Sequence, residues 1–273
     1  MNKQITRGAI WFEKLCHGQS IVPGYCPSVL VADVMSAGEK TRFITVVPDE
    51  SNRFPRAKLG EVGILEGWNL AKAVDEAVQA DLSCEVKRPI VAIIDVPSQA
   101  YGRREEGFAI NQALAGAAGA YAKARLAGHP VIGLIVGKAM SGAFLAHGYQ
   151  ANRLIALDDP FVEVHAMGKA SAARITLRSV ESLEKLAATI APMAYDIKNY
   201  ASLGILDELL QVSDANAPSA ADVEVIQSSL VTQIASARES GSSLMNRLGA
   251  SNRQSSALVR GKMRQQWHEL SKS

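Results

Sequence analysis

The sequence predicts an α/β fold in which parallel strands alternate with helices. Residues 89–96 (PIVAIIDV) and 130–136 (PVIGLIV) are continuous runs of mostly β-branched and apolar residues, which is typical of strands buried on both faces of a sheet. Each run is followed by a turn of small and polar residues and then by a helical segment. Strand, turn and helix in alternation indicate crossover connections between parallel strands.

The segment ahead of the first strand is predicted in four parts. Residues 1–27 show no clean hydrophobic period and contain several glycines and prolines, so an irregular arm is expected. Residues 28–49 hold two β-type runs around residues 36–39 (SAGE), which predicts a hairpin with a glycine-containing loop. Residues 51–63 are predicted to be a loop, and residues 64–83 have apolar side chains at helical spacing.

The strand–turn–helix unit then occurs twice. After the first strand one long helix is expected to run to about Ala127. After the second strand we expect a turn at residues 137–142 (GKAMSG) and a helix over residues 142–149. Two further short strands are predicted at residues 153–159 and 161–167.

The remainder is predicted to be mostly helical. One helix opens at Ser179 and ends at Pro192, and an amphipathic segment begins at Asp222. From Arg238 onward seven Lys and Arg residues stand against two acids, which fits either a solvated helical tail or a docking surface for an acidic partner. The chain is predicted to form one domain over residues 1–273, of which 222–273 are a C-terminal helical extension.

Composition limits the function classes. Of the 273 residues 48% are apolar and 21% are charged, which predicts a globular protein. The net charge of +2 is too small to attract nucleic acid or a membrane surface by itself. We find no secretory signal and no apolar run long enough to span a bilayer. Three cysteines without metal-ligand spacing predict a reducing, cytoplasmic environment and no metal site.

Binding sites in such folds lie at the carboxyl ends of the strands. Here these ends carry two turns, residues 97–102 (PSQAYG) and residues 137–142 (GKAMSG). Both precede predicted helices, so both offer backbone N–H groups that have no intrahelical partner. The site is therefore expected where these two turns meet.

The second turn allows three chemical interpretations. A phosphate-binding P-loop is rejected, because the glycine spacing is short and Ala139 follows Lys138 where Ser or Thr is required. A nucleophile elbow stays open, since small residues flank Ser141 and either His147 or His165 offers a base. In the third interpretation the backbone N–H groups of the turn stabilise a developing oxyanion.

These segments carry a family resemblance. The stretches GRREEGFAINQAL, AGHPVIGLIVGKAMSGAFLAHGYQANRLIALDDPFVEV and YASLGILDELL resemble the carboxyltransferase branch of the crotonase superfamily. RPIVAIIDVPSQAYGRREEG, the N-terminal arm and the chain length resemble the gamma subunits of biotin-independent malonate decarboxylases. The resemblance covers nearly the whole chain.

The resemblance implies a crotonase-like ββα spiral that pairs with a homologous beta subunit as a heterodimer within a larger complex. It implies a carboxy-lyase reaction, in which a malonyl thioester on an acyl carrier protein becomes the acetyl thioester and CO2. No cofactor is implied to bind directly. The substrate is carried on the CoA-like prosthetic arm of the carrier protein.

The resemblance also implies residue roles. The oxyanion amides fall at Ala139 and Met140, although a methionine here departs from the glycine of the related turn. Ser141 shapes the turn, and His165 is a candidate proton donor. The remaining candidates line the substrate pocket: Ser98, Gln99, Tyr101, Gly137, Lys138 and Gly142.

Arg103 and Arg104 are candidates for binding the substrate carboxylate or the phosphates of the carrier arm, whereas His147 is expected to be structural. Three alternatives stay open. The chain also resembles Clp-type serine peptidases, with Ser141 and His165 oriented by Asp196 or Asp207. It also fits a non-catalytic half of a carboxyltransferase pair, or a half of a biotin-dependent enzyme.

Overall fold

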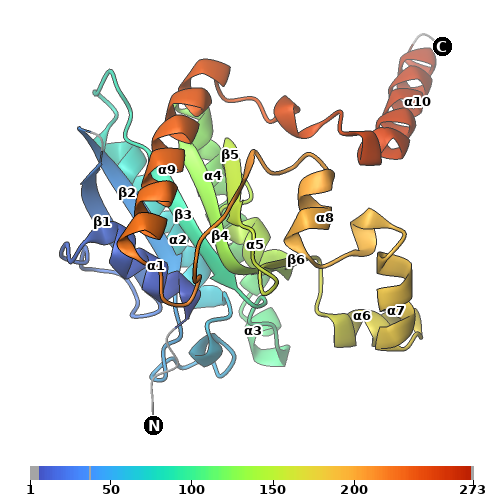
Figure 1. The fold of residues 1–273 in the computed structure, drawn as a ribbon, viewed down its shortest axis with the longest axis horizontal. Coiled ribbons are helices and arrows are strands. Elements are labelled where there is room, and N and C mark those ends of the chain that lie inside the picture. Colours follow the sequence, from blue (N-terminus) through green and yellow to red (C-terminus); the bar gives the residue numbers. More distant parts are fainter. Residues whose placement is uncertain (1–5, 37, 272–273) are drawn as a thin grey trace.

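The computed structural model describes residues 6–36 and 38–271 and confirms the α/β prediction. A central sheet has the strand order β1-β2-β3-β4-β5-β7, with β6 paired to β4 (Figure 1). β1 and β2 are antiparallel, and every other pairing in this sheet is parallel. The strands have these bounds: β1 Val29–Ser36, β2 Glu39–Val46, β3 Ile90–Val96, β4 Val131–Met140, β5 Arg153–Leu157, β6 Glu163–His165 and β7 Glu208–Leu210.

Helices cover both faces of the sheet. On one face α2 (Ile64–Ala80) and α4 (Ile110–Leu126) pack against each other and against the strands. On the other face lie α1 (Arg7–Cys16) and α9 (Ala220–Ser240), which also contact each other (Figure 1). No helix in the part of the chain that the structure describes is long and apolar enough to span a membrane.

The prediction of an irregular N-terminal arm was wrong for residues 7–16, which form α1. Thr6 caps this helix by accepting a hydrogen bond from the Ala9 N–H. Its inner face buries Trp11 and Leu15, and the Trp11 indole donates to the Ala215 carbonyl at 3.0 Å. The N-cap and the burial of the tryptophan stabilise a helix in a segment whose sequence shows no clean hydrophobic period.

The predicted hairpin is confirmed, with Ser36 opposite Glu39; Ala37 lies outside the described residues. The long helix predicted after β3 is instead two helices, α3 (Arg103–Gly107) and α4. They are separated at Ala109, whose φ of 59° is left-handed. Gly107 ends α3, but the residue in the left-handed conformation is an alanine.

The turn predicted at residues 137–142 was also wrong, because β4 continues to Met140. Its first half pairs with β5 and its last three residues pair with β6. Gly137 makes this possible, since a Cβ there would lie 2.1 Å from Asp95 Oδ1. The Asp95 carboxylate accepts hydrogen bonds from the Lys138 N–H at 3.0 Å and the Gly8 N–H at 3.2 Å.

Helix α5 (Ser141–Ala146) follows β4 directly. The predicted helix beginning at Ser179 is confirmed as α7 (Val180–Ala187), which is shorter than expected; Ser179 caps it. The amphipathic segment is confirmed as α9. α8 (Ile197–Ser202) and α10 (Gln254–Leu270) lie in the part of the chain predicted to be mostly helical, whereas α6 (Lys169–Thr176) was not predicted.

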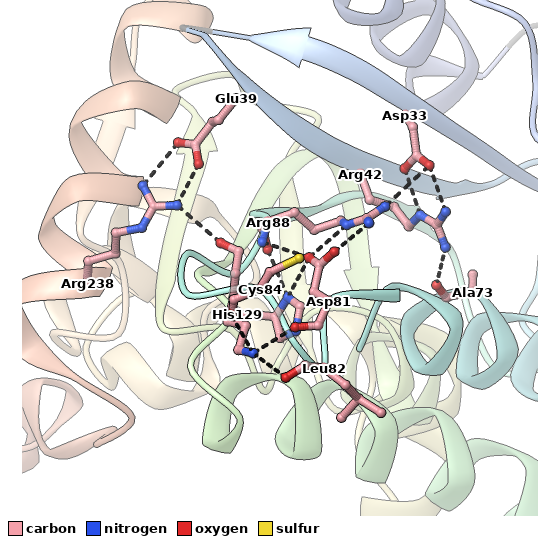
Figure 2. Close-up of polar contacts among 11 residues, drawn as sticks. Asp33, Glu39, Arg42, Ala73, Asp81, Leu82, Cys84, Arg88, His129 and Arg238 are labelled. Atoms are coloured by element: carbon pink, nitrogen blue, oxygen red, sulfur yellow. Dashed lines mark hydrogen bonds and ion pairs between the residues drawn. The ribbon is translucent and has the colours of Figure 1, made fainter. Parts of the chain in front are cut away.

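A network of ion pairs ties the hairpin, the loop after α2 and α9 together (Figure 2). Arg42 forms two hydrogen bonds of 2.8 Å with Asp33, and Arg88 pairs with Asp81. Arg238 of α9 pairs with Glu39 at the hairpin. Burial alone would raise the pKa of the Asp33 carboxyl, but the hydrogen bonds and charge of Arg42 hold that pKa below its usual value.

Candidate active site

The loop after β3 is held in place by a short stretch of backbone pairing. The Val62 N–H donates to the Ser98 carbonyl at 3.0 Å, and the Ala100 N–H donates to the Val62 carbonyl at 2.8 Å. This bridge fixes residues 98–100 in an extended conformation, in which the Gln99 side chain reaches α5.

The junction of β4 and α5 has an unusual backbone. Ser141 has a φ of 61°, in the left-handed region that a serine seldom adopts. Next to it, the Gly142 N–H donates to Gln99 Oε1 at 3.1 Å. A Cβ on residue 142 would lie 2.1 Å from that oxygen, so glycine permits the close approach of an acceptor to this amide.

The loop and the junction border one cavity of about 460 Å³. Of the predicted site residues, it brings together Ser98, Gln99, Tyr101, Ser141 and Gly142. The far wall, which the sequence did not predict, comes from residues 166–168 and from α6: Ala166, Met167, Gly168, Ser171, Arg174 and Ile175.

Arg174 contributes a positively charged side chain to the cavity wall. Its side chain is exposed, and within residues 6–36 and 38–271 its guanidinium has no ion pair or hydrogen bond. An unpaired guanidinium in a cavity is suited to bind a carboxylate or a phosphate. The sequence KASAARIT gave no signal of this role, because an arginine in an alanine-rich helix resembles an ordinary solvated residue.

Four predicted site residues lie in β4, just before the junction, and do not line the cavity. Ala139 pairs with Val96 of β3 and with Val164 of β6, and it is fully buried. Met140 is opposite His165 of β6. The ammonium of Lys138 lies 3.5 Å from the Glu163 carboxylate. The fourth, the glycine at position 137, packs against the Asp95 carboxylate.

His165 lies beside the cavity rather than in its wall. Its ring stacks on Tyr195 with centroids 3.9 Å apart, and its Nδ1 is 3.0 Å from the Met167 carbonyl oxygen. The Tyr195 hydroxyl donates to the same carbonyl at 2.8 Å. Burial lowers the pKa of His165. Together with Tyr195, the ring holds Met167, a residue that lines the cavity.

His147 belongs to the core, as predicted. Its Nδ1 lies 3.0 Å from the Tyr121 hydroxyl, and its Nε2 lies 2.9 Å from the Ile93 carbonyl oxygen. Burial lowers the pKa of this imidazole to about 4. Both ring nitrogens are occupied, so His147 does not serve as a base for Ser141.

The geometry for a serine nucleophile is therefore missing. Among the described residues, no histidine or carboxylate forms a hydrogen bond with the Ser141 hydroxyl. Asp196 instead caps α8 through the Asn199 N–H, and Asp207 accepts from the Leu154 N–H. A triad requires the base and its orienting acid to be linked to the nucleophile.

Arginine side chains stack on aromatic rings near α3. The Arg56 guanidinium lies 4.2 Å above the Tyr101 ring. Arg104 contacts the rings of Phe54 at 5.4 Å and Phe108 at 5.9 Å. Of these residues Tyr101 lines the cavity, and the Arg56 guanidinium also pairs with the Glu61 carboxylate.

A family profile and two solved structures similar to this chain all come from malonate decarboxylases. The profile of the malonate decarboxylase gamma subunit family matches residues 57–267. A Pseudomonas malonate decarboxylase hetero-tetramer solved with coenzyme A contains a chain that is 60% identical, with a TM-score of 0.92; the match covers 96% of this chain and all of that one. A Pseudomonas MdcD-MdcE hetero-dimer contains a chain that is 56% identical, with a TM-score of 0.89 and the same coverage.

A malonyl-S-ACP:biotin-protein carboxyltransferase of Malonomonas rubra is 35% identical over 192 residues. The match covers 69% of this chain and 62% of that relative, so the chain spans less than two thirds of its length. Transcarboxylase 12S, at 21% identity, shares the fold with a TM-score of 0.58 over 78% of this chain and 36% of that one. The predicted crotonase-like fold is thereby confirmed.

Proposed function

The chain belongs to the malonate decarboxylase gamma subunit family, and from this premise we propose that it acts as the gamma subunit of such an enzyme. Paired with a homologous beta subunit, it decarboxylates a malonyl thioester on an acyl carrier protein. The products are the acetyl thioester and CO2. The thioester enters on the CoA-like arm of the carrier, between Tyr101 and α6.

One observation carries this proposal: the Gly142 N–H, in the cavity wall, donates a hydrogen bond to Gln99 Oε1 at 3.1 Å, and the thioester oxygen would displace this amide oxygen as the acceptor. An amide oxygen resembles a thioester oxygen as an acceptor. When the carbon–carbon bond to the carboxylate breaks, its electron pair forms an enolate and the charge collects on the thioester oxygen. Fixed amide donors at that oxygen lower the barrier without a nucleophile.

We assign the oxyanion to the Gly142 amide in the cavity wall. Ala139 and Met140, the donors expected from the sequence, lie in β4 and do not line the cavity. Ser141 gives this segment its left-handed turn. The substrate carboxylate is bound by Arg174, whose guanidinium has no partner among the described residues. A proton must then reach the α-carbon, and His165, whose ring lies beside the cavity against the Met167 carbonyl, is the proposed donor.

A carboxyltransferase is the second candidate, because the Malonomonas rubra relative is named a malonyl-S-ACP:biotin-protein carboxyltransferase. Transfer to biotin passes through the same enolate, so the cavity serves both reactions. They differ in whether CO2 is released or is passed to a biotin protein.

The test uses the chain co-purified with its paired subunit and supplied with a malonyl thioester. We expect acetyl thioester and CO2 to form without biotin. We expect Ser141→Ala to keep a rate within about threefold of wild type, whereas loss of a true general acid or base typically costs about 10²–10⁴.

The other outcomes separate the alternatives. Turnover only after addition of a biotin protein would favour the carboxyltransferase. A rate abolished by Ser141→Ala would assign chemistry to the hydroxyl, and labelling by a fluorophosphonate probe would then identify a peptidase-type nucleophile.

A further inference from the structure

The Gln99 side chain lies where the proposed function places the oxygen of the substrate. Its Oε1 accepts the hydrogen bond of the Gly142 N–H at 3.1 Å, and both residues line the cavity of about 460 Å³. An amide oxygen and a thioester oxygen are acceptors of the same kind. A thioester that uses this N–H therefore has to compete with a side chain of the protein itself.

The backbone that carries Gln99 is fixed on both sides of the residue. The Ala100 N–H donates to the Val62 carbonyl at 2.8 Å, and the Gln99 carbonyl accepts from the Tyr101 N–H at 2.8 Å. These contacts hold the loop in place against the segment before α2. Rotation about the side-chain bonds of Gln99 is therefore the motion that separates its amide from Gly142.

The side chain of Gln99, by contrast, is held by a single neutral hydrogen bond. Within residues 6–36 and 38–271 its Nε2 has no hydrogen-bond partner, and the residue is only partly buried. The net contribution of one neutral hydrogen bond shifts an equilibrium by about 2- to 12-fold. The observed position is therefore favoured, but a competing acceptor can displace the side chain.

The contact also supplies an acceptor that Gly142 lacks within its own helix. Gly142 lies in the first turn of α5, where backbone N–H groups have no intrahelical acceptor. A Cβ at residue 142 would lie 2.1 Å from Gln99 Oε1, so a residue other than glycine would exclude this side chain. The absence of a side chain at position 142 is thus what permits Gln99 to approach this N–H.

We propose that Gln99 is a positioning residue that acts as a latch, whose amide oxygen holds the Gly142 N–H until a thioester oxygen replaces it. The inference rests on the proposed function, because it takes Gly142 as the donor to the thioester. The latch weakens the apparent affinity for any thioester in proportion to the fraction of molecules in which it is closed. It leaves the chemical step unchanged, since the side chain has rotated away before the carbon–carbon bond breaks. Closing again, it competes with the acetyl thioester and assists the release of this product.

A role as an oxyanion donor predicts different kinetics for Gln99. If the amide turned its Nε2 toward the enolate oxygen, it would stabilise the transition state, and its loss would lower kcat by about 10²–10³. A latch predicts instead that its loss lowers KM and leaves kcat unchanged. The two roles are therefore separated by which of the two kinetic constants changes.

The test compares Gln99→Leu and Gln99→Asn with Gln112→Leu in the assembled pair. Leucine removes the acceptor, whereas asparagine keeps an amide that is one methylene too short to reach Gly142. Gln112 is an exposed residue of α4 that does not line the cavity. For both Gln99 variants we expect KM for the malonyl thioester and the dissociation constant of acetyl coenzyme A to fall by the same factor, about 2- to 12-fold. We expect kcat to stay within about twofold of wild type, and Gln112→Leu to change none of these quantities.

Amide hydrogen exchange reports on the latch without any thioester. The Gly142 N–H should exchange about 2- to 12-fold faster in both Gln99 variants than in wild type and in Gln112→Leu. Unchanged exchange at Gly142, an unchanged or higher KM, or a large fall in kcat would each overturn the proposal. Variants that bind acetyl coenzyme A more tightly in a pair that forms no CO2 from a malonyl thioester would refute the proposed function and support the latch. A pair with neither turnover nor tighter binding would refute both.

Discussion

Ser141 and Gly142 show how the backbone of two residues prepares the site. Ser141 accepts a left-handed φ of 61°, at a cost of about 1–3 kcal/mol for a residue other than glycine. The conformation turns the chain from strand into helix within one residue. Gly142 then leaves room for an acceptor oxygen at its N–H.

Arg174 gives the sharpest prediction for a single side chain. Because its guanidinium is unpaired among the described residues and lines the cavity, Arg174→Ala should lose a charge-assisted contact with the substrate carboxylate. Such a contact contributes about 1.5–3 kcal/mol, so we expect KM for the malonyl thioester to rise about 10- to 100-fold. We expect kcat to change little, since the contact is present before CO2 leaves.

Arg178→Ala is the matched control, because Arg178 is also exposed and follows α6 but does not line the cavity. Steady-state kinetics of both variants in the assembled pair provide the measurement. An unchanged KM for Arg174→Ala would show that another cation binds the carboxylate, and Arg103 and Arg104 would be examined next.

At the scale of elements, the change of partner along β4, from β5 to β6, places the junction. Gly137→Ala would put a Cβ 2.1 Å from Asp95 Oδ1, and that carboxylate is held by two backbone N–H groups. Displacing the carboxylate would break these hydrogen bonds. We therefore expect a loss of about 1–3 kcal/mol in the free energy of unfolding. Decarboxylation should fall as well, because residues 139–142 are displaced.

Urea denaturation of Gly137→Ala and Gly119→Ala checks this prediction. Gly119 lies in α4, where an added Cβ meets nothing within 4 Å, so alanine there should stabilise the chain by up to about 1 kcal/mol. If Gly137→Ala unfolded at the wild-type urea concentration, the packing of Asp95 against residue 137 would not be what sets the path of β4.

The elements also show which features a sequence can predict. The apolar runs of β3 and β4 and the cap at Ser179 are local signals, and the structure confirms them. The end of β4 was predicted too early because Gly137 resembles a turn residue, whereas it serves a close approach to Asp95 from another strand. That contact joins residues about 40 positions apart, so no local pattern contains it.

The same distinction applies to the candidate site. Gln99 and Gly142 were predicted together because both follow parallel strands, and strand ends meet at one edge of a sheet. Arg174 was missed because a helix from a later part of the chain carries it to the cavity. His165 was predicted at a strand end, as observed, but its stacking on Tyr195 is a contact between segments that the sequence does not reveal.

For the whole molecule, the ion-pair network links the first strands to α9 (Figure 2). Arg88 occupies its centre: it pairs with Asp81 through two hydrogen bonds, of 2.8 and 2.5 Å, and lies 3.6 Å from Asp33. Arg238 connects Glu39 to the Lys87 carbonyl. These contacts hold the sheet and α9 in register.

Arg88→Met should therefore destabilise the entire chain. Asp81 is 4% exposed, and removing its guanidinium partner leaves a buried carboxylate without a counter-charge, which typically costs about 3–5 kcal/mol. Adding Asp81→Leu should recover much of this loss, because the unpaired charge is then gone. Lys123→Met, which breaks the exposed pair with Asp75, should cost less than about 1 kcal/mol. Urea denaturation of the three variants provides the free energies of unfolding. A double variant no more stable than Arg88→Met alone would mean that Arg88 acts through Asp33 and the hairpin, and the connection between the first strands and α9 would depend on that contact instead.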